Sequence, residues 1–202
     1  MTDVVAYPEE FAARYRAAGV WGGKTIPQEL RAMARQRPDD LALATGTGQL
    51  TYRRLDERTD RLAAGLVGLG LKPGERVLLQ IANDGWAVLA WYALLKAGLV
   101  PVATLPFHRK HEMADVAAQV QPAAHLIQVD FKGNDLAALA QEIGAPLVLT
   151  LHGDVDGATT FETLDGDPAV LDDIVVDPDS VAAMQLSGGT TSTPKIIPRL
   201  HA

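Results

Sequence analysis

The sequence predicts an α/β fold in which a mostly parallel sheet is flanked by helices. Between residues 41 and 150, short apolar runs of strand character alternate with longer runs whose apolar residues recur at helical spacing. Glycine, proline or polar residues separate most of these runs. Hydrophobic residues make up 48% of the 202-residue chain and charged residues 21%, a composition that supports a packed core. Alternating strands and helices are typical of parallel pairing, because each helix carries the chain back across the sheet.

The first part of the chain is expected to hold three helices and a short strand. Two helices, over residues 8–18 and 27–36, begin near a proline and end before a glycine or a proline. A strand over residues 41–44 follows. Over residues 52–69 leucines recur at helical spacing, while charged residues occupy the other faces. This segment is therefore predicted as an amphipathic helix, with Thr51 as its N-cap.

The middle of the chain continues the alternation. The expected elements are strands at residues 77–81, 99–103, 124–129 and 147–150, and helices at residues 84–95, 111–120 and 135–143. The first of these helices, capped by Asp84, is apolar on all sides, so we expect it to be buried with Trp86, Trp91 and Tyr92 in the core. A long polar connection over residues 152–179, with room for a short helical turn, leads to an apolar strand at residues 181–186.

Composition excludes several classes of function. The chain has no cysteine, which excludes disulfides, thiolate metal sites and a cysteine nucleophile. A formal net charge of −7 argues against binding to nucleic acid. The longest apolar stretch, residues 86–95, is about half of the roughly 20 residues that span a bilayer, and no basic segment precedes an apolar run at the N-terminus. We expect a cytoplasmic protein without a membrane partner.

No resident metal site is expected. Residues 133–194 contain no lysine or arginine but many aspartates and glutamates. No spacing such as Asp-x-Asp-x-Asp-Gly with a later Glu supports a divalent-cation site, so a solvated acidic surface is favoured. His108 and His111 lack the spacing of a zinc-binding helix, and nothing in the sequence suggests a general base at His125 or His152.

A run of small hydroxylated residues follows the strand at 181–186. It consists of Ser187, Gly188, Gly189, Thr190, Thr191, Ser192 and Thr193, followed by Pro194 and Lys195. Glycines allow close approach of the backbone to a ligand, successive amides can surround an anion, and Lys195 adds a positive charge. On composition alone such a run is more often a flexible connection, and a polyphosphate-binding loop between two strands is the alternative. Pro194 before the lysine excludes a Walker A loop.

The segment from Leu186 to Arg199, followed by His201, resembles the phosphate loop of adenylate-forming enzymes. This superfamily includes acyl-CoA synthetases, luciferases and the adenylation domains of peptide synthetases. The paired glycines and the Ile-Pro-Arg-x-His ending resemble one branch, the aryl acid–AMP ligases that load 2,3-dihydroxybenzoate or salicylate in siderophore and nonribosomal peptide biosynthesis. Further similarity to that branch is found at residues 7–11, 19–21, 50–52, 71–77, 95–98 and 105–109.

The resemblance implies the N-terminal part of the large domain of such an enzyme. It divides the chain into an N-terminal extension (1–25), an α/β part (26–180), and a strand with the phosphate loop (181–202). The acyl pocket and the C-terminal domain would be absent, so the chain alone is expected to be inactive.

The reaction implied by the resemblance begins when an aryl carboxylate attacks the α-phosphate of Mg²⁺-bound ATP. Acyl-adenylate and pyrophosphate form, and the acyl group then passes to the pantetheine thiol of an aryl carrier protein. Ser187 to Thr193 would surround the phosphates, with Lys195 as the cation. His201 would be catalytic with Lys195, bordering the acyl pocket and moving between the two half-reactions.

Two residues depart from the pattern. Ser192 stands where the family usually has glycine, which costs roughly 1–2 kcal/mol if the site requires a left-handed backbone. Leu200 replaces a common threonine. Two further interpretations stay open: an acyl- or aryl-CoA synthetase, and a catalytically silent nucleotide-binding or interaction module.

Overall fold

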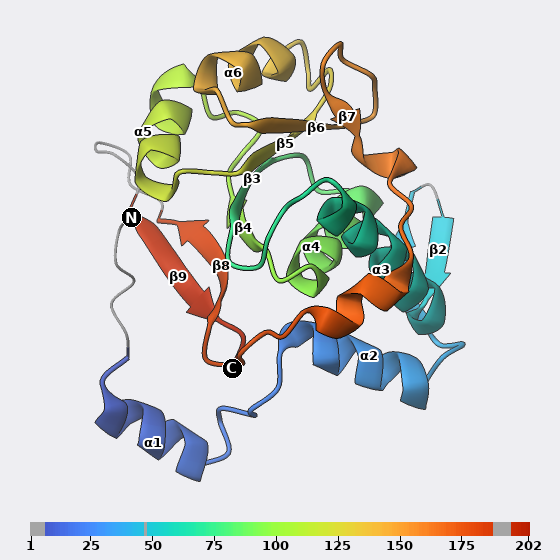
Figure 1. Ribbon diagram of the computed structural model, residues 1–202, viewed down its shortest axis with the longest axis vertical. Helices are drawn as coiled ribbons and strands as arrows, with labels where there is room; N and C mark the ends of the chain where they lie inside the picture. The colour runs from blue at the N-terminus through green and yellow to red at the C-terminus, as the bar shows by residue number, and fades with distance from the viewer. Residues whose placement is uncertain (1–6, 47, 188–194) are drawn as a thin grey trace.

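The computed structural model describes residues 7–46, 48–187 and 195–202. Its centre is a seven-stranded sheet in the order β7-β6-β5-β3-β4-β8-β9 (Figure 1). Neighbouring strands pair in parallel except β8 and β9, which form an antiparallel hairpin at one edge. The strands are β3 (Arg76–Gln80), β4 (Val100–Ala103), β5 (Ala124–Gln128), β6 (Leu147–Leu151), β7 (Thr159–Thr160), β8 (Val181–Leu186) and β9 (Ile196–Leu200). The predicted architecture is confirmed.

Helices cover both faces of the sheet. Val77 and Leu79 of β3 face a core shared with α3 and α4, whereas Leu78 between them faces a second core under α5. This alternation follows from the two-residue period of a strand. The helices are α1 (Glu9–Ala17), α2 (Ile26–Gln36), α3 (Tyr52–Gly68), α4 (Gly85–Lys96), α5 (Lys110–Val120) and α6 (Leu136–Ile143). The six helices predicted between residues 8 and 143 agree with these bounds to within one residue.

Side-chain caps fix where several helices begin. The Thr51 side chain accepts a hydrogen bond from the amide of Arg54, and the Asp84 carboxylate accepts from the amides of Trp86 and Ala87. Both predicted N-caps are thus confirmed. These bonds satisfy amides that have no partner within the helix.

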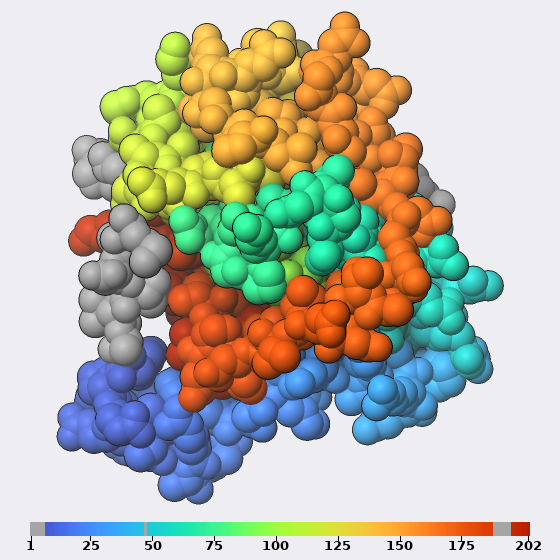
Figure 2. Space-filling view, in the orientation of Figure 1, coloured from blue at the N-terminus to red at the C-terminus, as the bar shows by residue number. Residues whose placement is uncertain are grey.

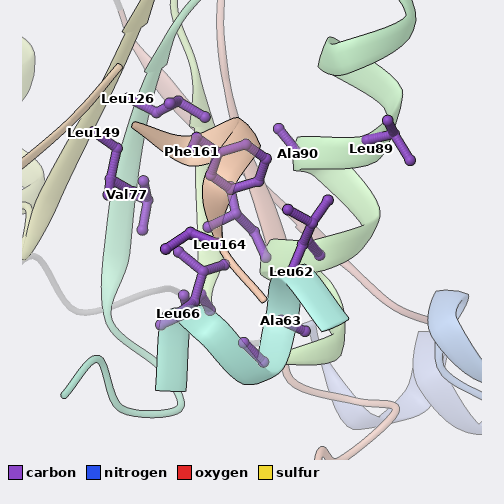
Figure 3. Packing of buried hydrophobic residues seen from close by; sticks show 14 of the residues in the cluster. Leu62, Ala63, Leu66, Val77, Leu89, Ala90, Leu126, Leu149, Phe161 and Leu164 are labelled. Carbon is purple, nitrogen blue, oxygen red and sulfur yellow. The ribbon is translucent and has the colours of Figure 1, made fainter. Parts of the chain in front are cut away.

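Two features were not predicted. Residues 48–51, of which only Thr51 was predicted, as an N-cap, form strand β2 (Gly48–Thr51), which pairs with β1 (Leu41–Thr45) as a separate hairpin. The connection after β6, which is polar in composition, also contributes to the core. Its short helix η1 (Phe161–Thr163) places Phe161 there, fully buried. Figure 3 shows its ring between Ala90 of α4 and the sheet residues Leu126 and Val77. The connection therefore completes the core.

The aromatic residues of α4 pack against the main core, as expected, but at its margin. Trp86, Trp91 and Tyr92 are partly buried, while Leu94 and Leu95 are fully buried. Near its beginning α4 lies close to the surface, where the Trp86 ring meets the Arg58 guanidinium at 5.6 Å and the Phe161 ring at 6.5 Å. No helix in the described ranges is both long and apolar enough to cross a membrane.

The N-terminal segment lies along one end of the molecule. Figure 2 shows it (blue) beside the final part of the connection to β8, which includes the short helix η2 (Pro168–Asp173). Arg16 of α1 pairs with Asp179 at 2.5 Å, and Tyr7, Tyr15 and Trp21 pack as an aromatic group. The long-range ion pair attaches α1 to the residues just before β8.

Candidate phosphate-binding site

The β8–β9 hairpin carries both ends of the predicted phosphate loop. Ser187 follows β8 directly, and Lys195 directly precedes β9. The Ser187 amide donates to the Lys195 carbonyl at 2.9 Å, and the Lys195 amide donates to the Ser187 hydroxyl at 3.3 Å. The strand–loop–strand arrangement expected from the sequence is therefore present. The other predicted phosphate ligands, Gly188, Gly189, Thr190, Thr191, Ser192 and Thr193, lie outside the described residues.

The hairpin opens at the edge of the sheet where the parallel strands end. β8 pairs in parallel with β4, with Val102 opposite Met184 and Ala103 opposite Gln185. The segment after β4 and the segment after β8 therefore leave the sheet side by side. Ligands of open α/β sheets bind outside the carboxyl ends of the strands. The predicted loop is at the edge of the sheet where a nucleotide would be expected.

Lys195 is available to bind an anion. It is exposed, and among the described residues its ammonium has no hydrogen bond or ion pair. Arg199, by contrast, donates from Nε to the Gln185 side-chain oxygen at 3.1 Å, across the β8–β9 pair. Of these two basic residues, Lys195 is the one without a partner in the described part of the chain.

His201 lies at the other end of β9. Its Nδ1 accepts a hydrogen bond from the Ile26 amide at the start of α2, at 3.3 Å, and its own amide donates to the Ser180 carbonyl. Burial lowers the pKa of its imidazole below the usual value. Lys195 and His201 are separated by the whole of β9, about 20 Å at ~3.3 Å per residue. The structure does not bring these two predicted catalytic residues together.

A hollow of about 810 Å³ lies beside His201. Its lining is mostly apolar and includes Val100, Val181, Met184 and Ile196. Part of the lining, Gly74 and Arg76, comes from the edge where the parallel strands begin, opposite the predicted loop. Neither Ser187 nor Lys195 is among the lining residues, although Ile196, which follows Lys195 directly, is one of them.

The remaining histidines serve structural contacts. His125 is fully buried, and burial lowers its pKa to about 4. His152, for which no partner was predicted, contacts two carboxylates: its Nε2 lies 2.6 Å from Asp84 and its Nδ1 lies 3.4 Å from Glu162. Because Asp84 is 68 residues away in the sequence, no local spacing indicated this pair. In the described part of the chain, no group of three or more histidines and carboxylates could hold a metal ion.

The acidic stretch after residue 133 provides caps and ion pairs. Asp135 accepts a hydrogen bond from the amide of Ala138 and so begins α6, and Asp165 pairs with Arg61 at 2.9 Å. Asp167 caps η2 in the same way as Asp135 caps α6. Such roles match the expectation of a solvated acidic surface.

Comparison with known proteins places this geometry in a family. Residues 30–202 match the family model described as AMP-binding enzyme. The chain is 42% identical over 212 residues to the salicyl-AMP ligase / salicyl-S-ArCP synthetase of Mycobacterium tuberculosis, covering 98% of this chain and 37% of that protein. It is 38% identical over 212 residues to the vibriobactin-specific 2,3-dihydroxybenzoate-AMP ligase of Vibrio cholerae, covering 99% of this chain and 38% of that protein.

A solved structure agrees with these relatives. The apo structure of MbtA from Mycobacterium smegmatis superposes with a TM-score of 0.85 at 35% identity, covering 98% of this chain and 37% of that one. The chain thus spans less than two fifths of the length of the proteins it matches. With 173 of its residues inside the family model and the hairpin at the expected edge of the sheet, the chain belongs to the AMP-binding enzyme family.

Proposed function

We propose that the protein containing this chain is an aryl acid–AMP ligase. It activates an aromatic carboxylic acid of the 2,3-dihydroxybenzoate or salicylate type with Mg²⁺-bound ATP, and releases pyrophosphate. The observation that carries the proposal is the Ser187–Lys195 hairpin base at the carboxyl edge of a parallel sheet, in a chain similar to two ligases named for these acids. These 202 residues are proposed to be insufficient for the reaction, because they span only 37–38% of those ligases.

The proposed site stabilises charge on the phosphates. Negative charge grows on the leaving pyrophosphate as the carboxylate attacks the α-phosphorus. Donors that are already oriented toward this charge cost little reorganisation, and each hydrogen bond to a charged group contributes about 1.5–3 kcal/mol. We assign this role to Ser187 and to Gly188, Gly189, Thr190, Thr191, Ser192 and Thr193. Lys195 supplies the compensating cation.

Magnesium is proposed to arrive with ATP, since Mg²⁺ in nucleotide sites is bound largely by phosphate oxygens and water. Support comes from the hydroxyl of Ser187 and from the ammonium of Lys195, which is exposed and has no partner among the described residues; both groups suit phosphate oxygens. The acceptor of the acyl group is proposed to be the phosphopantetheine thiol of an aryl carrier protein, and free coenzyme A is the alternative that the assay must separate.

The test is pyrophosphate exchange into ATP by the full-length protein, with and without salicylate or 2,3-dihydroxybenzoate. Lys195→Met should reduce acid-dependent exchange by about 10- to 100-fold, because an ion-assisted contact is lost at the phosphates. Lys72→Met is the matched control: Lys72 is also exposed but lies in the turn before β3, at the opposite edge of the sheet. Equal exchange by both variants, or exchange that does not need the aromatic acid, would contradict the proposal.

A second incubation separates the acceptors. Full-length protein with acid and ATP is mixed with either phosphopantetheinylated aryl carrier protein or coenzyme A, and the thioester is measured. Transfer to the carrier alone supports the proposed ligase. Transfer to coenzyme A alone would reassign the protein as an aryl-CoA synthetase. Absence of ATP binding would favour the interpretation as a catalytically silent module.

A further inference from the structure

Two polar side chains lie fully buried in neighbouring strands of the sheet. Gln80 ends β3, His125 lies in β5, and neither is exposed to solvent. The His125 Nε2 and the Gln80 side-chain oxygen are 3.2 Å apart. Apolar residues would fill these positions at lower desolvation cost. The pair therefore needs an explanation beyond packing.

The other end of the Gln80 amide reaches the segment after β4. Its Nε2 donates to the His108 carbonyl at 2.9 Å and to the Leu105 carbonyl at 3.4 Å. The Leu105 amide in turn donates to Nδ1 of His108 at 3.2 Å. A chain of hydrogen bonds thus runs from the sheet interior to the turn over residues 105–108.

The pattern of donors and acceptors allows one arrangement of the pair. Both hydrogens of the Gln80 amide face carbonyl oxygens, so its own oxygen faces His125 and must accept from Nε2–H. The Nδ1 of His125 is buried and has no partner. A proton there would be an unsatisfied buried donor, which disfavours the other tautomer. Neutral His125 thereby holds the Gln80 amide in the orientation with its oxygen toward His125 and its nitrogen toward the turn.

The turn that Gln80 holds lies next to the candidate phosphate site. Ala103 is opposite Gln185 in the parallel β4–β8 pair, so the residues that follow each strand leave the sheet together. Thr104, the first residue after β4, is held against β3, because both its amide and its hydroxyl donate to the Leu79 carbonyl, at 3.0 and 2.7 Å. Gln80 and Thr104 thus fix the path of the chain after β4, the strand that pairs with β8 just before Ser187.

We infer that Gln80 is a positioning residue for the nucleotide site, and that His125 orients its amide. Together they hold the turn at residues 105–108, which follows β4, in a fixed position relative to the end of β8 that leads to Ser187. This inference rests on the proposed function, because the position of the turn matters only if ATP binds at the loop between Ser187 and Lys195. It concerns ATP affinity rather than the chemical step, since the hydrogen bonds of both side chains in the described residues go to the turn and to each other, not to Ser187 or Lys195.

The experiment uses the full-length protein and compares four variants. Gln80→Met and His125→Leu remove the donor–acceptor chain, whereas His125→Gln keeps an N–H for the Gln80 oxygen. Thr150→Val is the matched control: Thr150 is also fully buried, in β6, and its hydroxyl has no partner in the described residues. KM for ATP, kcat and the thermal midpoint are measured for each, together with hydrogen–deuterium exchange of residues 104–109.

We expect Gln80→Met and His125→Leu to raise KM for ATP by about 5- to 10-fold, the worth of one or two neutral hydrogen bonds, with kcat changed by less than about twofold. Exchange at residues 104–109 should accelerate in both. His125→Gln and Thr150→Val should match the wild type. If Gln80→Met does not fold, the two His125 variants decide the question alone.

Unchanged KM and unchanged exchange in His125→Leu would overturn the inference. A rise in KM that follows the thermal midpoint in every variant, Thr150→Val included, would also overturn it. Failure of the proposed function is separate, because it is seen as absence of acid-dependent activity in the wild type. In that case hydrogen exchange still reports whether Gln80 holds the turn.

Discussion

Ser187 and Lys195 exchange two hydrogen bonds across the base of the β8–β9 hairpin, one between backbone groups and one from the Lys195 amide to the Ser187 hydroxyl. The same hydroxyl thus fixes the lysine backbone and stands at the mouth of the predicted phosphate loop. Ser187→Ala removes this hydroxyl. We expect the Kd for ATP in the full-length protein to rise by about 3- to 10-fold, the worth of one hydrogen bond.

Isothermal titration with ATP measures this change. Ser180→Ala is the control, because the Ser180 hydroxyl donates only to the nearby Asp177 carbonyl at the opposite end of β8. Equal affinity in Ser187→Ala and wild type would show that the hydroxyl has no part in the site.

The ammonium of Lys96 is buried among carboxylates, with only 2% of its side chain exposed. It contacts the Asp56 carboxylate at 2.5 Å and the Asp60 carboxylate at 2.8 Å, and so joins α4 to α3. Lys96→Met leaves two partly buried negative charges without this partner. We expect the free energy of unfolding to fall by about 3–5 kcal/mol, measured by urea denaturation.

Lys110→Met is the matched comparison for Lys96. Lys110 is exposed and lies 3.4 Å from Glu142, so its loss should change the free energy of unfolding by less than about 1 kcal/mol. Similar losses in the two variants would show that burial of Lys96 does not determine its contribution.

His125 predicts a pH dependence of stability. Burial lowers its pKa to about 4, so the unfolded chain binds a proton at this site before the folded chain does. The stability due to neutral His125 is fully present above its unfolded pKa of about 6.5, and is lost as pH falls toward 4, up to ~3 kcal/mol. Wild type should therefore lose more stability than His125→Gln between pH 7 and pH 4.5. Parallel urea-denaturation profiles would contradict this assignment.

Gly166 marks the closest approach of the connection to α3. A Cβ at this position would lie 2.6 Å from the Ala64 carbonyl carbon and from the Gly65 nitrogen. Gly166→Ala should lower the free energy of unfolding by about 1–3 kcal/mol, because the contact involves backbone that cannot move aside. Gly68→Ala is the control: it lies in α3 with nothing within 4 Å, and alanine should stabilise the helix there by roughly 0.5–1 kcal/mol. Thermal unfolding of both variants tests the pair.

The fold was predictable from local patterns to a large extent. Alternating periodicity located the helices and the main parallel strands, and Thr51 and Asp84 were recognisable as caps because capping depends on residues within one turn. Phe161 was not predicted in the core, since its burial depends on strands and helices far away in the sequence. The degree of burial of Trp86, Trp91 and Tyr92 in α4 was not predictable for the same reason.

The candidate site was predictable only in part. The hydroxyl-rich run predicted a phosphate loop, and the structure adds that its two ends, Ser187 and Lys195, lie at the carboxyl edge of the sheet. Gln80 and His125 carried no local signal, because their bond joins residues 45 apart. The position of His201 against α2 depends on a contact 175 residues away. Such contacts are set by the topology of the sheet, which composition and spacing do not specify.

The most direct test of the account is a crystal structure of the full-length protein with a non-hydrolysable ATP analogue. We predict that the triphosphate lies at the carboxyl edge of the sheet, within hydrogen-bonding distance of the Ser187 hydroxyl and the Lys195 ammonium. A triphosphate bound elsewhere, for example in the hollow beside His201, with Lys195 pointing into solvent, would contradict it.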